Sequence, residues 1–162
     1  MVLSSFLQGF ELEKLLPSMP TYLGGFIFWM FFLILLGPLV MLGFGALYRY
    51  KPTQEINHKM GFRLNRKITA QNVWDYTQRL AGTAYLLVGG AMAGAFALVG
   101  IALAIINTYA LVVGTLVMVI IEAVLIAGLW LGINLVVSDI FDDNGNVRKA
   151  SKYAKIKFLK PM

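Results

Sequence analysis

In this sequence of 162 residues, the carboxylate of Glu122 is the group best placed to take part in chemistry. It is the only charged residue of the apolar stretch 109–137 and lies near its centre. An ionised carboxylate facing lipid is costly, so we expect Glu122 to be protonated, to face other helices, or to have a polar partner. Such a group could sense a ligand, couple to a proton, bind a partner, or form a purely structural hydrogen bond.

The groups that most catalytic and metal chemistry requires are missing from the sequence. There is no cysteine, His58 is the sole histidine, and the metalloprotease, Walker A and nucleophile-elbow patterns do not occur. The turn at Asp142–Gly145 is not a calcium loop, because aligning Gly145 with the loop glycine puts Ile140 at the first ligand position and Ser151 where the bidentate glutamate is needed. We therefore predict no enzyme activity, no catalytic residues, no metal and no other cofactor.

The composition places the chain among integral membrane proteins. Hydrophobic residues make up 59% of it, charged residues 14%, and the mean hydropathy is +0.73. We predict one all-α membrane domain, with transmembrane helices at 22–47, 82–106 and 109–137, each long enough to cross a hydrocarbon core of about 30 Å. The net charge of +6 is explained by cations that flank these spans, so direct binding of nucleic acid is not expected.

Two further helices are predicted outside the spans. Residues 1–20 have apolar positions near helical spacing and fit a helix lying in the membrane interface. A second interfacial helix, with Thr69 as its N-cap, is expected to end the polar loop 48–81 and lead into the second span. Gly37–Pro38 predicts a kink in the first span, and Asn107–Thr108 predicts a tight hairpin between the other two.

The distribution of cations predicts the orientation. Of 14 Lys and Arg residues, seven lie between the first two spans, six lie in the tail 138–162, and only Lys14 lies elsewhere. The positive-inside rule puts the loop and the tail in the cytoplasm, with the amino terminus outside. Five cations are expected to meet anionic lipid headgroups: Arg66, Lys67, Lys152, Lys155 and Lys157.

Small residues form close-packing faces in the second span. Gly90 and Gly94 form a G-xxx-G pair, which lets another backbone approach closely. Such a face could pack against the chain's own helices, or it could receive a partner peptide or a second copy.

One pattern of residues runs through the polar loop into the start of the second span: Pro52, Ile56, Asn57, Gly61, Phe62, Arg63, Thr69, Trp74 and Arg79 to Gly82. This pattern resembles the signature of the SdpI-type immunity protein family. Leu64 stands where that pattern has threonine, and Gln78 where asparagine is common. The resemblance implies a bacterial cytoplasmic membrane protein that senses or neutralises a hydrophobic toxin peptide and recruits a repressor at its cytoplasmic face.

These observations lead to two hypotheses about function. In the first, Glu122, Gly90 and Gly94 sense a peptide in the membrane, and the loop forms a docking surface for a cytoplasmic partner. The residues proposed for that surface are Asn57, Gly61, Arg63 and Trp74; contact with lipid headgroups is the alternative role for Arg63 and Trp74. In the second hypothesis, the protein is a structural or accessory subunit of a larger membrane complex, such as a transporter or an envelope assembly.

Overall fold

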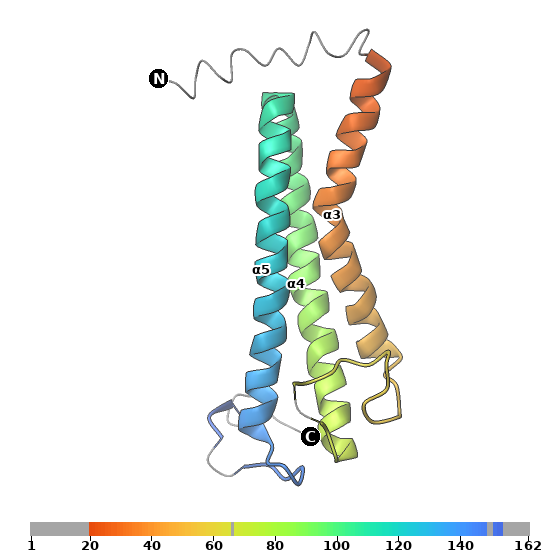
Figure 1. Cartoon of the computed structure of the whole chain (residues 1–162), viewed down its shortest axis with the longest axis vertical. Helices are drawn as coiled ribbons and strands as arrows, with labels where there is room; N and C mark the ends of the chain where they lie inside the picture. Colours follow the sequence, from red (N-terminus) through yellow and green to blue (C-terminus); the bar gives the residue numbers. More distant parts are fainter. Residues whose placement is uncertain (1–19, 66, 149–150, 154–162) are drawn as a thin grey trace.

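The computed structural model describes residues 20–65, 67–148 and 151–153. They form three helices: α3 (Pro20–Tyr50), α4 (Gln71–Ile106) and α5 (Thr108–Ile140). The predicted interfacial helix at 1–20 and most of the basic tail lie outside the described residues. In Figure 1, α4 and α5 run side by side, and α3 lies along them.

All three helices are long and apolar enough to cross a membrane, as the sequence predicted. The protein therefore has the architecture of an all-α, multi-pass membrane protein. A helix suits this environment because it satisfies its backbone hydrogen bonds internally, where lipid offers no partner.

Helix α4 differs from the prediction at its first turn. The interfacial helix and the second span form one continuous helix of 36 residues, about 54 Å long, so α4 is longer than the hydrocarbon core is thick. The predicted Thr69 N-cap is wrong. Ala70 holds the N-cap position without a side-chain hydrogen bond, and the Thr69 hydroxyl instead donates to the carbonyl of Asp143 at 3.1 Å.

The predicted tight hairpin between α4 and α5 is confirmed. Asn107 is both the C-cap of α4 and the N-cap of α5. Its side-chain oxygen accepts a hydrogen bond from the Ala110 amide at 2.7 Å. One extended residue therefore joins two antiparallel helices.

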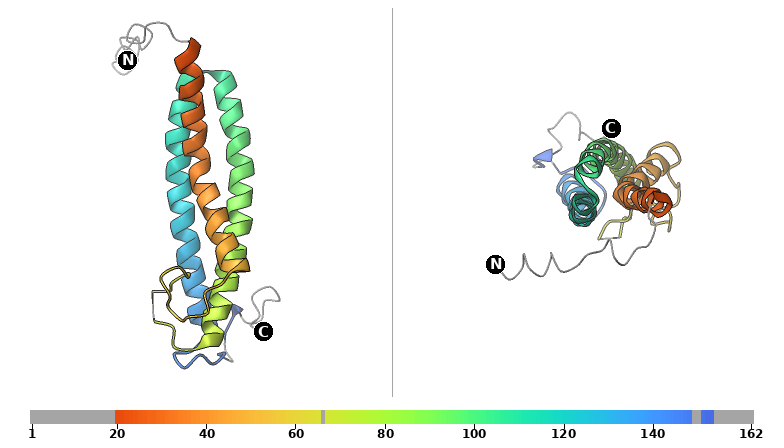
Figure 2. Two further views of the ribbon diagram at one scale, coloured as in Figure 1. Left: turned by 90° about the vertical axis from the view of Figure 1, so that its right-hand side faces the viewer. Right: turned by 90° about the horizontal axis from the view of Figure 1, so that it is seen from above.

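The opposite end of the bundle, here called the loop end, holds the rest of the polar structure. Residues 51–70 and 141–148 both lie there, next to the first turns of α4 (Figures 1 and 2). The described parts of the two basic regions thus lie at one end of the bundle, as three spans require.

Glycines let the backbones of α3 and α4 come into direct contact. A Cβ atom added at Gly82 would lie 2.6 Å from the backbone nitrogen of Arg49, and one at Gly45 would lie 2.8 Å from that of Leu86. At Gly89 the nearest atoms would be the Met41 Cβ at 3.0 Å and the Pro38 carbonyl at 3.2 Å. Small residues at these positions set how closely the two helices pack.

Most of the surface along the spans is apolar. In the most apolar window of each helix, no more than 22% of the residues are buried inside the bundle. Outward-facing side chains include Phe28, Leu98, Ile105, Ile120 and Leu135, each more than 60% exposed. Lipid or apolar partners must cover these side chains.

The glycine contacts give a first testable prediction. Gly82→Ala should lower the free energy of unfolding by about 1–3 kcal/mol, because the added methyl group meets backbone atoms that cannot rotate away. Gly94→Ala is the matched control, since a Cβ there meets no described atom within 4 Å. Unfolding in mixed micelles with increasing SDS, followed by circular dichroism, measures the difference. Equal stability of the two variants would contradict this account.

Candidate functional site at the loop end

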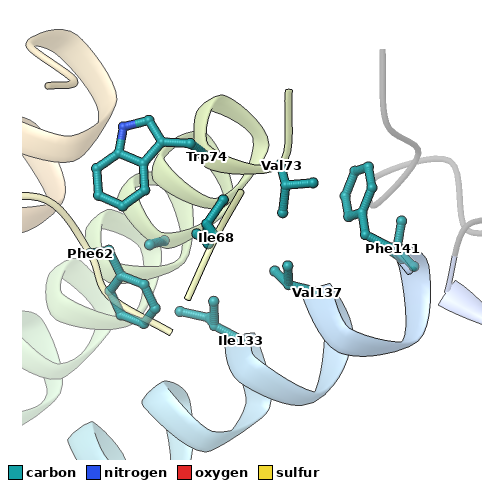
Figure 3. Packing of buried hydrophobic residues seen from close by; sticks show 9 residues of the cluster. Phe62, Ile68, Val73, Trp74, Ile133, Val137 and Phe141 are labelled. Atoms are coloured by element: carbon teal, nitrogen blue, oxygen red, sulfur yellow. The ribbon is translucent and has the colours of Figure 1, made fainter. Parts of the chain in front are cut away.

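A compact apolar cluster organises the loop end. Figure 3 shows loop residues Phe62 and Ile68 beside Val73 and Trp74 of α4, facing Ile133 and Val137 of α5. We call this cluster the loop-end core. Its buried members are Phe62, Ile68, Val73, Trp74, Ala81, Ile133, Val137, Ile140 and Phe141.

Trp74 of α4 belongs to this core and is fully buried. Its indole N–H donates to the carbonyl of Thr53 at 2.7 Å. The ring lies directly against Gly61, where a Cβ atom would be 2.5 Å from the ring atom Cη2. Gly61 and Trp74 are therefore a matched pair, because the indole occupies the space that any larger residue at 61 would need.

Asn57 fixes the turn of the loop. Its φ of 61° is in the left-handed region, which asparagine tolerates better than most residues. Its side-chain amide donates to the Ile68 carbonyl at 2.8 Å, and its side-chain oxygen accepts from the Ile68 amide at 3.4 Å. Arg63 closes the turn, since its Nη2 donates to the Asn57 carbonyl at 3.1 Å while its side chain stays exposed.

Gln78 binds the loop to α4. Its side-chain oxygen accepts from the Phe62 amide at 2.9 Å, and its side-chain nitrogen donates to the Phe62 carbonyl at 3.0 Å. Both groups are buried, so the pair satisfies backbone that would otherwise be costly to bury. The sequence marked Gln78 only as a departure from the family pattern, so this role was not predicted.

Two residues of α5 bind the other side of the loop. The Asn134 side-chain oxygen accepts from the Asn65 amide at 2.7 Å, and the Trp130 indole donates to the Arg63 carbonyl at 3.3 Å. The Asn134 amide also donates to the Trp130 carbonyl at 2.8 Å. Sequence reasoning missed both residues, although a tryptophan and an asparagine one turn apart are unusual in so apolar a helix.

The segment after α5 forms a turn that packs on the start of α4. The Asp142 carboxylate accepts from the amides of Asn144 at 3.0 Å and Asn146 at 2.7 Å. The hydrogen bonds from Asn146 are the main reason why the pKa of Asp142 lies below its usual value. Gly145, with a φ of 82°, packs against Ala70 and accepts from the Asn72 side chain at 2.9 Å.

The described cations surround this folded end. All eight are exposed to solvent, and they come from α3, the loop, α4 and the segment after α5. Of the cations predicted to meet lipid, Lys67 and Lys152 belong to this group, while Arg66, Lys155 and Lys157 lie outside the described residues. The basic set is Arg49, Lys51, Lys59, Arg63, Lys67, Arg79, Arg148 and Lys152.

The residues predicted to sense a peptide do not form one surface. Glu122 is only 6% exposed and faces α3, where its carboxyl group lies against Gly37. Gly90 and Gly94 are exposed, and of the described atoms only Leu42 Cδ2, at 4.0 Å from Gly90, comes near a Cβ added at either position. Glu122 and the Gly90–Gly94 pair are therefore two separate candidate sites for sensing a peptide, not one shared site.

The structure brings together the four predicted docking residues Asn57, Gly61, Arg63 and Trp74, but it exposes them unequally. Arg63 is exposed, Asn57 is half-buried, and Gly61 and Trp74 are buried. A partner that docks on the folded loop would therefore touch Arg63 and not the Trp74 ring. Trp74 also cannot act as a headgroup anchor while it is enclosed in this way.

No protein-family model, curated protein or solved structure matches the chain. Within the described parts of the chain, no three His, Cys, Asp or Glu side chains are grouped so as to hold a metal ion. The fold and the loop end define the class, a multi-pass membrane protein whose first two spans are joined by a folded polar loop.

Substitutions at Asn57 test how the loop is built. Asn57→Gly keeps the left-handed backbone but loses the two hydrogen bonds with Ile68, so we expect a loss of about 1–3 kcal/mol in unfolding free energy. Asn57→Ala should lose about 1 kcal/mol more, because alanine also opposes the positive φ. Unfolding in SDS measures both variants. If alanine were tolerated as well as glycine, the backbone part of this account would be wrong.

Proposed function

We propose that the protein is an SdpI-like immunity and signalling protein of the bacterial cytoplasmic membrane. Its membrane helices would sense or neutralise a hydrophobic toxin peptide, and its loop end would recruit a repressor in the cytoplasm. One observation supports the proposal above the others: residues that carry the family resemblance are partners in a single folded unit.

The resemblance rests on a pattern spread over about 30 residues, and the pattern has a physical meaning here. Gly61 accommodates the Trp74 ring, and Arg63 donates to the carbonyl of Asn57 at 3.1 Å. A chance similarity of sequence would not be expected to select residues that depend on one another in this way. The pattern is therefore best explained as the set of residues that a loop of this shape requires.

The same loop offers a route for signalling. The segment 62–65 is hydrogen-bonded on one side to Gln78 of α4 and on the other to Asn134 of α5. A peptide that altered the spacing of these helices would strain or break one of the two attachments. The exposed face of the loop, including Arg63 and Lys67, would then change shape, and a bound partner would be gained or lost.

A second candidate function is that of an accessory subunit in a larger membrane complex. It is supported by the exposed Gly90 and Gly94 and by the extensive apolar surface of the spans. A permanent partner helix could use these surfaces. Purification in mild detergent distinguishes the two functions, because an accessory subunit should migrate with unrelated subunits in fixed stoichiometry.

The predicted orientation can be tested by thiol labelling, since the chain has no native cysteine. Thr108→Cys at the hairpin should react with a membrane-impermeant maleimide in intact cells. Asn65→Cys in the loop should react only after the cells are permeabilised. The reverse pattern would place the loop outside the cell and would end the proposal of a cytoplasmic partner.

The immunity function can be tested by survival and co-purification together. Expression of the chain in a sensitive bacterial strain should raise its survival when a hydrophobic peptide toxin is added. Arg63→Ala combined with Lys67→Ala should retain protection but lose about tenfold or more of the co-purifying cytoplasmic partner, since about 1.4 kcal/mol of contact corresponds to a factor of ten.

Lys59→Ala is the matched control, because Lys59 is an exposed cation of the same loop outside residues 61–67. Trp74→Ala is unsuitable for this purpose, because losing a fully buried tryptophan unfolds the loop itself. Undiminished partner binding by the double variant would refute the docking role. Absence of protection by the unaltered chain would refute the immunity function.

A further inference from the structure

Halfway along the bundle, all three helices meet at the proline of α3. Gly89 of α4 lies against the carbonyl of Pro38, and Glu122 of α5 lies against Gly37. Ile34, one turn earlier on α3, is fully buried. This junction is separate from the loop end, and the inference drawn from it does not rest on the proposed function.

The carboxyl group of Glu122 occupies the space of a missing side chain. Its Oε2 atom lies close to where a Cβ atom of residue 37 would be, so the Glu122 carboxyl group uses space that Gly37 leaves free. The other oxygen, Oε1, is buried and has no hydrogen-bond partner among the described residues. A carboxylate oxygen left in this way inside an apolar bundle is strongly disfavoured.

Pro38 leaves one backbone carbonyl of α3 without a hydrogen-bond donor. Proline has no backbone N–H, so the carbonyl of Ile34, four residues earlier, loses its helical donor. Prolines are tolerated in membrane helices when a neighbouring group satisfies the freed carbonyl. Serine and threonine hydroxyls in helices show the geometry, because from near the Cβ position they reach the carbonyls three and four residues earlier.

Glu122 holds an oxygen beside Gly37, next to the turn of α3 that carries the carbonyls of Leu33 and Ile34. The Leu33 carbonyl is the helical acceptor for the Gly37 amide. The carbonyl three residues before Gly37 is that of Ile34, the one that Pro38 leaves without a donor. A carboxylate can only accept hydrogen bonds, whereas a carboxylic acid carries one O–H that can donate. One proton on Oε2 would therefore neutralise the carboxylate and supply a donor for the Ile34 carbonyl, leaving Oε1 as an uncharged carbonyl oxygen that costs less to bury.

We propose that Glu122 is a proton-binding site inside the bundle. In its protonated form, its O–H donates a hydrogen bond to the Ile34 carbonyl and replaces the amide N–H that Pro38 lacks. The proton neutralises the carboxylate and ties α5 to α3 at mid-depth. Its release leaves two acceptors facing each other, so α3 and α5 separate at this point.

The surroundings contain no charge that would hold the ionised form. From residue 24 to 48 of α3 and from 80 to 106 of α4, the sequence has no Asp, Glu, Lys, Arg or His. The remaining titratable groups in these stretches are Tyr48 and Tyr85, which pack on each other toward the loop end. Tyr109 of α5 lies at the hairpin end and is 62% exposed.

A double-mutant cycle tests the pairing of Glu122 with Pro38. Glu122→Met keeps the length of the side chain but removes its donor. It should lower the ratio of folded to unfolded protein by roughly three- to eighteenfold, which is the range measured for hydrogen bonds between membrane helices. Pro38→Ala restores the backbone amide. In that background, Glu122→Met should change the equilibrium by less than about twofold.

Glu122→Gln is the matched control, because its side-chain N–H can donate without a bound proton, and it should be as stable as the unaltered protein. SDS unfolding measures all of these variants. If Glu122→Met has the same effect with and without Pro38, the two residues act independently and the proposal is wrong.

Infrared spectroscopy detects the proton directly. At neutral pH the unaltered protein in lipid should show a carboxylic-acid C=O band that Glu122→Gln abolishes. Pro38→Ala should shift this band to higher frequency, because the acid loses its hydrogen bond to Ile34. Absence of the band at neutral pH would overturn the proposal, since the group would then be ionised.

Discussion

Direct contact between the backbones of α3 and α4 is the constraint on which the rest of the structure depends. Lipid is as apolar as the helices themselves, so their association gains little from the hydrophobic effect and relies on close packing. Gly45, Gly82 and Gly89 provide that closeness at intervals along the bundle. Larger residues at these points would hold the helices apart, and the loop could no longer reach both α4 and α5.

The loop end and the middle of the spans accommodate polar groups differently. At the loop end, an apolar core around Trp74 lies beneath backbone bound by the side chains of Asn57, Gln78 and Asn134, which resembles the interior of a soluble domain. At mid-depth, polar atoms are few, and each one without a partner is costly. This difference explains why specific contacts concentrate at one end while the outer surface of the spans stays uniformly apolar.

The sequence predicted the coarse architecture because the properties that determine it are local. Charge-free runs define the spans, and Asn107 between two such runs defines the hairpin. The sequence did not predict what joins the loop to the helices, because Gln78 pairs with Phe62 across 16 residues and Asn134 with Asn65 across 69. The Thr69 cap failed for a related reason: a hydroxyl suited to start a helix locally finds a partner in the distant segment after α5. The prediction grouped Gly90 with Glu122 because composition shows that residues are small or acidic, whereas packing decides which way they face.

The single residue between α4 and α5 limits how this molecule can move. Asn107 caps both helices, so neither can slide along the other without losing its cap. Relative motion is thereby reduced to a change of angle about one fixed point, and displacement grows with distance from it. Asn134 lies about 40 Å away at 1.5 Å per residue, so a tilt of about 2° moves it by about 1.4 Å. Added to the 2.7 Å between Asn65 and Asn134, such a step would exceed hydrogen-bond length. The hairpin therefore magnifies a small disturbance within the membrane into a broken contact at its edge.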